Sequence, residues 1–281
     1  MKKGSFHIEQ LSEGFFEIFR DGTLQKMEPV RLESIQDDSS LGKHSSPIGI
    51  DPVYITDGEV HILLDAGLGW GLDHRSRYKN TSNTVTNLEI FGINPEQIQF
   101  VVLSHLHYDH AAGSTRVNEQ FKTESVFPNA RYILQQKEWE SALQNHDQSH
   151  EGPGVGYRMD ELYKLAAEKR FHFIDEEFYK LIPGIDLIRS GGHTAGHQIV
   201  RINGENGPAY YMGDLIPTEY HLNHYAMKQI DENPLQSKKF KTLLLREAFN
   251  SGAYLYFYHS LFKKSGKLAR DEDKKYVLLE E

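Results

Sequence analysis

The sequence predicts a mixed α/β fold in which one functional site is assembled from the ends of several strands. Short runs rich in β-branched and aromatic residues, such as 100–103, have the composition of buried strands. Longer segments with apolar residues at helical spacing lie between them, and 236–249 is the longest. Several predicted strands run directly into loops that contain His, Asp and Gly. Polar side chains that follow strands in this way favour an open site over a closed core.

Length and composition restrict the class of protein. The chain has 281 residues, 38% hydrophobic and 25% charged, so it can bury a sizeable core. Its net charge of −9 makes a nucleic-acid partner unfavourable. It has no cysteine, which excludes disulfides and thiolate metal sites. The first residues contain no apolar signal segment, and no run reaches the ~18 apolar residues of a membrane span. We therefore expect a cytoplasmic protein with no membrane partner.

The first quarter of the chain predicts hairpins and one long connection. Residues 6–20 have the pattern of two short strands around a turn at 12–14. Residues 53–64 predict a second hairpin, because two apolar runs flank an Asp-Gly pair. Residues 21–47 are polar and lack periodicity, and connections of this length are commonly functional. This segment is expected to cover the mouth of a site or to form a contact in a homodimer.

Two later segments are expected outside the core. Residues 144–170 combine a Gly-Pro-Gly joint with a helical pattern at 159–169, which fits either a lid or an ordinary helical hairpin packed on the outside. The tail after Lys263 is rich in charge, and we expect it to be peripheral.

The segment from 104 to 113 predicts a metal site. His105, His107, Asp109 and His110 lie within six residues, directly after a predicted strand. On an extended backbone His105 and His107 point the same way, and a turn would bring Asp109 and His110 to a second point nearby. We expect a helix to follow from Ala111, with its positive end toward the site. Such a cluster favours metal binding over a chance grouping among the 15 histidines.

These residues resemble the His-x-His-x-Asp-His signature of the metallo-β-lactamase superfamily of hydrolases. The resemblance extends to the Gly-His-Thr-x-Gly-His segment at 192–197, the Gly-Asp pair at 213–214 and a His after the last aromatic strand. By this match His193 and His259 bind metal and Asp214 bridges two metals. His197 is expected to be a buried hydrogen-bonding residue. The resemblance also implies that Asp65, at the end of an earlier strand, braces the metal-binding loop.

The resemblance implies a four-layer αββα sandwich, two mixed sheets with helices outside, as a single domain over 1–281. Residues 21–47 and 144–170 would be insertions or a lid. It implies two divalent metal ions, with zinc as the default and manganese or iron as alternatives. One ion would be held by three histidines, His105, His107 and His193. The other would be held by Asp109, His110 and His259. Asp214 would bridge the two ions.

The resemblance is closest to the quorum-quenching N-acyl-homoserine lactonases. It implies a small-molecule substrate, a metal-bound hydroxide that attacks the carbonyl of a lactone, and Asp109 as the catalytic residue that transfers the proton. The family has a Tyr three residues after the bridging Asp, where this chain has Pro217, so Tyr220, His221 or His224 is expected to contact the substrate. An organophosphate triesterase-like hydrolase and a non-catalytic metal-binding protein are the alternatives. Seven ligands favour catalysis, because a structural zinc site needs only four.

Overall fold

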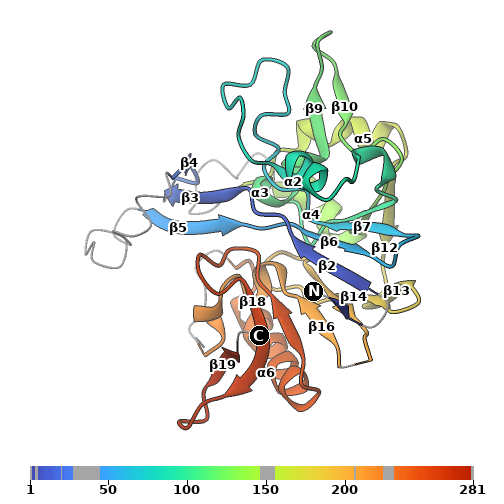
Figure 1. Ribbon diagram of the computed structural model, residues 1–281. Helices are drawn as coiled ribbons and strands as arrows, with labels where there is room; N and C mark the ends of the chain where they lie inside the picture. The colour runs from blue at the N-terminus through green and yellow to red at the C-terminus, as the bar shows by residue number, and fades with distance from the viewer. Residues whose placement is uncertain are drawn as a thin grey trace.

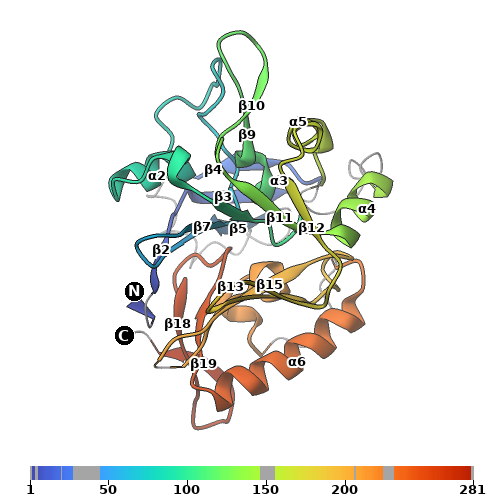
Figure 2. The same cartoon turned by 90° about the vertical axis from the view of Figure 1, so that its right-hand side faces the viewer.

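The structure is a computed structural model that describes residues 2–3, 6–19, 21–27, 45–145, 156–205, 207–223 and 231–279. In these residues two seven-stranded mixed sheets pack together, and the helices lie on their outer faces (Figure 1). The view in Figure 2 shows α2, α4 and α5 above the upper sheet and α6 below the lower one. This is the αββα sandwich that the sequence led us to expect.

The first sheet has the strand order β1-β2-β6-β7-β8-β11-β12. The pairs β7-β8, β8-β11 and β11-β12 are parallel, and the other pairs are antiparallel. Its strands are β1 (Lys2–Lys3), β2 (Phe6–Gln10), β6 (Val53–Thr56), β7 (His61–Leu64), β8 (Phe100–Val102), β11 (Arg131–Gln135) and β12 (Phe171–Ile174).

The second sheet runs in sequence order from β13 to β19, and only β16 and β17 are a parallel pair. Strands β14, β16 and β17 therefore point in one direction, and the loops that follow them meet at one end of the sheet. Its strands are β13 (Phe178–Ile182), β14 (Ile185–Arg189), β15 (Gln198–Ile202), β16 (Ala209–Tyr211), β17 (Tyr254–Tyr256), β18 (Ser265–Arg270) and β19 (Tyr276–Leu279).

The remaining elements flank these sheets. A three-stranded sheet consists of β3 (Gly14–Phe19), β4 (Leu24–Lys26) and β5 (Ser45–Ile50), and a hairpin of β9 (Thr115–Val117) and β10 (Thr123–Ser125). The helices are α2 (Thr84–Ile90), α3 (Tyr108–Ala111), α4 (Gln136–Asn145), α5 (Tyr163–Ala167) and α6 (Pro234–Asn250). Single 3₁₀ turns are η1 (Pro95–Gln97), η2 (Ala112–Ser114), η3 (Met159–Glu161), η4 (Gly213–Leu215) and η5 (Glu219–His221). No helix in the described ranges has both the length and the apolar character needed to cross a membrane.

Side-chain alternation along the strands creates three apolar layers. In β7, Ile62 and Leu64 face the second sheet, whereas Leu63 between them faces the helices, because successive side chains of a strand point to opposite faces. On the far side of the second sheet, Leu255 of β17 packs with Leu245 of α6. Each fully buried aliphatic side chain contributes about 1.5–3 kcal/mol. The central layer therefore fixes the separation of the two sheets, between whose strand ends the site is formed.

Two sequence predictions about strands were wrong. Residues 6–20 do not form a hairpin, because β2 pairs with β6 while β3 pairs with β5 in another sheet. The buried carboxylate of Glu13 accepts hydrogen bonds from Leu68 and Thr84, so the chain turns between sheets there. The tail after Lys263 is not peripheral, because β18 and β19 complete the second sheet.

Other predicted segments differ in their bounds. The helix expected from Ala111 instead begins at Tyr108, so it carries part of the predicted metal site within its single turn. The irregular segment 21–47 contains β4 and the start of β5, and 28–44 lies outside the described residues. In the 144–170 insertion, 146–155 also lies outside them, and the helical pattern at 159–169 is divided into η3 and α5. The lid therefore stays a prediction.

Candidate metal centre

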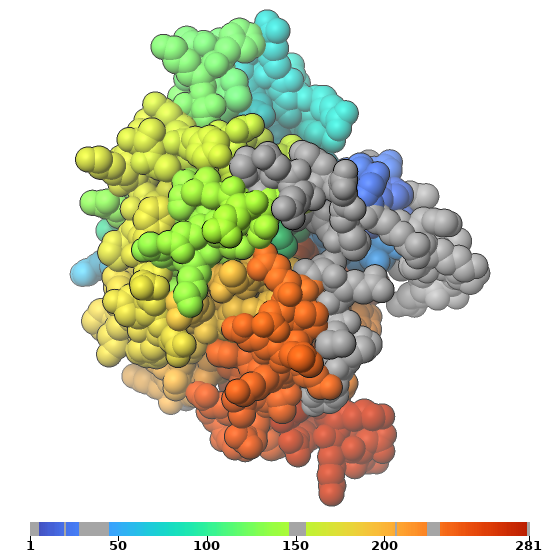
Figure 3. All heavy atoms as spheres, turned by 180° about the vertical axis from the view of Figure 1, so that it is seen from behind, coloured from blue at the N-terminus to red at the C-terminus, as the bar shows by residue number. Residues whose placement is uncertain are grey.

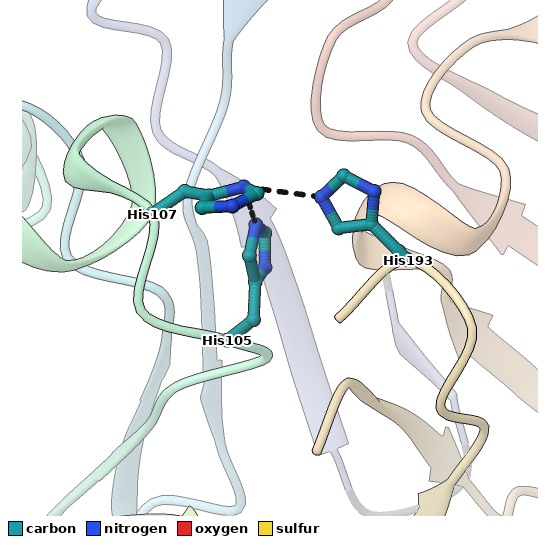
Figure 4. Close-up of side chains that lie close together, drawn as sticks. All are labelled: His105, His107 and His193. Atoms are coloured by element: carbon teal, nitrogen blue, oxygen red, sulfur yellow. Dashed lines mark hydrogen bonds between the residues drawn. The ribbon is translucent and has the colours of Figure 1, made fainter. Parts of the chain in front are cut away.

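Three histidines from two distant loops direct ring nitrogens toward one point (Figure 4). His107 Nδ1 lies 2.9 Å from His105 Nε2 and 3.1 Å from His193 Nε2. Burial and the neighbouring histidines lower the pKa of His105 and of His107 well below the usual range. The imidazoles are therefore held neutral, which is the state that donates a lone pair to a metal ion. We call His105, His107 and His193 the first group.

Side chains of helix α3 and of the loop after β17 also lie close together. His110 Nε2 lies 3.3 Å from His259 Nε2, and Asp109 Oδ2 lies 3.5 Å from the same nitrogen of His259. Burial alone would lower the pKa of His110, but the carboxylates of Asp109 and Asp65 outweigh burial and raise it well above the usual range. We call Asp109, His110 and His259 the second group.

The carboxylate of Asp214 lies between the two groups. Its Oδ2 is 3.3 Å from His193 Nε2 of the first group, and its Oδ1 is 3.1 Å from His259 Nε2 of the second. Burial would raise the pKa of this carboxyl, but the facing histidines, His259 foremost, lower it well below its usual range. Asp214 is therefore an ionised carboxylate with one oxygen turned toward each group.

The seven side chains fit a dinuclear metal site. Three sets of three of these ligand atoms lie within 4.8 Å of one another, and all the donors are imidazole nitrogens or carboxylate oxygens. Nitrogens about 2.0–2.1 Å from a shared tetrahedral ion would be separated by about 3.3 Å, close to the observed spacing. Without an ion, His107 Nδ1 lies within hydrogen-bond distance of both His105 Nε2 and His193 Nε2, although a single ring N–H can serve only one of them. The structure thus brings together all seven residues that were predicted from the sequence.

The family comparison agrees with this geometry. Residues 47–276 match the metallo-beta-lactamase superfamily. The chain belongs to this superfamily. Its fold is similar to that of a probable metal-dependent hydrolase from Staphylococcus aureus, which is 25% identical, with a TM-score of 0.76 and coverage of 100% of this chain and 99% of the other. The dizinc quorum-quenching lactonase AidC, solved with a product, is 21% identical, with a TM-score of 0.72 and coverage of 100% and 96%.

Curated relatives include N-acyl homoserine lactonases. One from a Bacillus species is 28% identical over 188 residues, which are 65% of this chain and 64% of that protein. One from Bacillus cereus is 31% identical over 121 residues, which are 43% of this chain and 39% of that protein. The matched region of this chain thus covers less than two thirds of the length of each of these two relatives.

In this superfamily member Asp65 supports the second group, as the sequence led us to expect. Its Oδ2 is 2.7 Å from His110 Nδ1, and it accepts hydrogen bonds from the backbone and hydroxyl of Ser104 at 2.6 and 2.7 Å. Tyr211 of the second sheet donates its hydroxyl to the same carboxylate at 2.5 Å. Asp65 therefore fixes the ring of His110 and connects it to both sheets, without facing the shared point itself.

Other supporting groups were missed by sequence reasoning. Asp231 Oδ1 lies 3.0 Å from His193 Nδ1, and the carbonyl oxygen of Gly49 lies 2.8 Å from His259 Nδ1. A carboxylate or carbonyl on the far ring nitrogen orients an imidazole and increases its basicity. Neither residue belongs to a His-containing motif, and each is distant in sequence from its partner. The only local signal was the Asn-Pro helix start at 233–234, directly after Asp231.

His197 behaves as the sequence analysis expected. Its Nδ1 lies 2.6 Å from the hydroxyl oxygen of Ser190, and its Nε2 accepts a hydrogen bond from the backbone of Asp214 at 3.0 Å. Since both nitrogens are engaged in this way, His197 positions the loop of Asp214 rather than facing the shared point.

Two of the three residues expected to replace the family's substrate-contacting Tyr, Tyr220 and His221, lie within the described residues. Tyr220 has an exposed fraction of 68%. Nδ1 of His221 lies 2.7 Å from the hydroxyl oxygen of Thr218. His224 lies outside the described residues. Their role in substrate binding stays a prediction.

Proposed function

We propose that this chain is a hydrolase with a dinuclear metal site and that its substrates are small carboxylic esters, with lactones first. The first group would hold one ion, the second group would hold the other, and Asp214 would bridge them. The position of Asp214 carries this proposal, because its two oxygens face different groups at 3.3 and 3.1 Å. Similarity to N-acyl homoserine lactonases supports the choice of lactones.

Two divalent ions in such a site supply a water molecule of lowered pKa and withdraw electron density from the substrate carbonyl. Zinc is the first choice for His and Asp ligands, with manganese or iron as alternatives. Burial and the neighbouring histidines lower the pKa of His105 and of His107, which holds these two imidazoles neutral, and Asp109 lies beside His259.

Asp109 is assigned to proton transfer. Burial raises the pKa of its carboxyl, against the opposing effect of His110 and His259. Tyr258 donates its hydroxyl to the backbone oxygen of Asp109 at 2.6 Å, which fixes the turn that carries the carboxylate. A fixed carboxylate with a raised pKa can take a proton from the attacking water and return it to the leaving alcohol oxygen. The ester C–O bond breaks, water is consumed, and a hydroxy acid is released.

A cavity of about 240 Å³ beside α3 is assigned to the part of the substrate beyond the ester. Tyr108, between the ligands His107 and Asp109 in sequence, lines it together with Trp70 and Tyr78, whose rings stack at 4.0 Å. The rings of Trp70, Tyr78 and Tyr108 offer this cavity an aromatic wall for an apolar acyl group. Tyr108→Ala should therefore change the preference among acyl lengths more than it changes metal content.

The test is a substrate panel with the zinc-loaded protein. Ring opening of acyl-homoserine lactones and of simple γ- and δ-lactones is followed by proton release, beside phosphotriester hydrolysis and with Asp109→Asn as the inactive control. We expect lactone turnover that a chelator abolishes and added zinc restores. Phosphotriester turnover far above every lactone and ester rate would overturn the proposal in favour of the triesterase alternative. Metal binding without turnover of any substrate would favour a non-catalytic metal-binding protein.

A further inference from the structure

The buried carboxylate of Glu138 joins the two loops that carry the first group. Glu138 lies in the first turn of α4 and has no exposed surface. Its Oε1 accepts a hydrogen bond from the backbone of Leu106 at 3.0 Å. Its Oε2 accepts hydrogen bonds from the hydroxyl of Thr194 at 2.6 Å and the backbone of Gly196 at 3.1 Å. Leu106 lies between two ligands of one loop, and Thr194 directly follows the ligand of the other.

The loop 190–197 is also enclosed by backbone contacts on both sides. A Cβ atom at Gly196 would lie 2.2 Å from the backbone nitrogen of Glu138, and one at Gly192 would lie 2.6 Å from that of Ser237. The loop is therefore packed between the starts of α4 and α6, whose surfaces border each other in the space-filling view from behind (Figure 3). Direct packing of Gly196 against the backbone of Glu138 therefore sets the distance between this loop and Glu138.

The bases of the two loops are joined independently of Glu138. The backbone of Gln198 donates to the carbonyl oxygen of Ser104 at 2.9 Å, and its side chain donates to that of Leu103 at 2.8 Å. These contacts precede the ligands in one loop and follow them in the other. The tips of the loops, where His107 and His193 bring ring nitrogens to 3.1 Å, depend on a different link.

We propose that Glu138 is a positioning residue that sets the separation of the two loop tips and thereby the ion affinity of the first group. The proposal rests on the proposed function, which assigns one ion to each group. The second group does not share this link, because Asp65 and the carbonyl of Gly49 hold its histidines. Loss of the link should therefore weaken one ion and not the other.

The carboxylate is required because both of its oxygens face donors. A glutamine at this position has nearly the same size but only one acceptor oxygen, so its amide NH₂ would face either Leu106 or the pair Thr194 and Gly196. Glu138→Gln therefore breaks the link to one loop while it keeps the packing. A buried donor is then left without a partner, so some loss of stability accompanies the change.

The experiment compares Glu138→Gln with Glu13→Gln in the full chain. Glu13 is the matched control, because it is equally buried and its oxygens also accept three hydrogen bonds, from Leu68 and Thr84. Zinc affinity at both sites is measured by competition with a chromophoric chelator, and Tm is measured for the metal-free proteins. We expect Glu138→Gln to weaken one zinc by about 10–100-fold and leave the other unchanged. Glu13→Gln should lower Tm without weakening the zinc of the first group.

Equal weakening of both zinc ions in Glu138→Gln, or the same selective pattern in Glu13→Gln, would overturn the proposal and leave a purely structural role. If Glu138→Gln does not fold, Thr194→Val removes one of the three donors, and it should weaken the same single zinc to a smaller extent. No change in either zinc with Thr194→Val would then overturn the proposal. Since the readout is zinc affinity, absence of lactone turnover would contradict the proposed substrate but not this role. A wild-type chain that binds one zinc would contradict both.

Discussion

The two groups of ligands differ in how the chain holds them. The first group consists of three histidines on the tips of two loops, supported by Asp231 and Glu138. The second group contains a carboxylate and is connected to the sheets themselves, since Asp65 contacts both Ser104 after β8 and Tyr211 in β16. One fold thus places a more negative group, connected to the sheets, beside a group that depends on loop contacts. We therefore expect the second group to bind its ion more tightly.

A change at Asp214 should affect both groups, because the two oxygens of this carboxylate face different groups. Asp214→Asn removes the negative charge and leaves one amide oxygen to serve two ions. We expect loss of more than one ion equivalent of tight binding and a fall in kcat greater than the about 100-fold typical of changes in supporting residues. Elemental analysis and turnover measurements check this. Retention of two tight ions would show that Asp214 is not a bridge.

Single-ligand changes should separate the groups. His193→Ala is expected to remove the ion of the first group, and His259→Ala the ion of the second, because each takes one nitrogen from its group. Each variant should retain one ion per chain by elemental analysis and lose most of its activity. In the wild type, stepwise chelator addition should remove the ion of the first group before the other. Unchanged stoichiometry in both variants would contradict the assignment.

The sequence was sufficient to predict that these seven side chains lie together, because each follows a strand and lies within a short motif. The seven residues come from four segments, and β8, β14, β16 and β17 all direct their ends toward one site. The residue types at 105–110 indicated metal chemistry, and the family resemblance extended it to His193, Asp214 and His259.

The supporting residues could not be predicted in the same way. Glu138 lies in α4, and the sequence around it gives no sign that its carboxylate reaches residues 106 and 194–196. Glu13 appeared to lie in a hairpin turn, whereas it is buried against Leu68 and Thr84. Strand β18 was missed because only Gly266 and Leu268 of its residues are buried, within a charged segment. In each case the partner that gives the residue its role is distant in the chain.

The supporting carboxylates provide a finer test of the comparison. Asp231→Asn should weaken the ion of the first group and Asp65→Asn that of the second, each by about 10–100-fold, because an amide on the far ring nitrogen orients the imidazole less firmly. Zinc competition measures both affinities. Asp65→Asn should also lower Tm, since Ser104 and Tyr211 donate to the same carboxylate. The opposite pairing of variants and ions would contradict the division into two groups.

The smallest effect on turnover is expected at Glu13, which holds the loop after Asp65 through Leu68. Burial raises the pKa of its carboxyl from 4.5 to about 7, against the hydrogen bonds from Leu68 and Thr84. Between these two pH values the unfolded chain has lost this proton and the folded chain still holds it. The contribution of Glu13 to the free energy of unfolding therefore falls as pH rises, by roughly 3 kcal/mol.

Glu13→Gln removes this titration, so the stability of the wild type relative to the variant should be highest near pH 4.5 and lowest above pH 7. Urea unfolding of both metal-free proteins at several pH values gives this difference directly, and effects of the histidines common to both proteins cancel. If the difference does not vary with pH, the pKa of this carboxyl in the folded chain is not raised above its value of 4.5 in the unfolded chain. The hydrogen bonds from Leu68 and Thr84 would then offset the effect of burial on the pKa, and a buried charge would hold the turn at Glu13 near neutral pH.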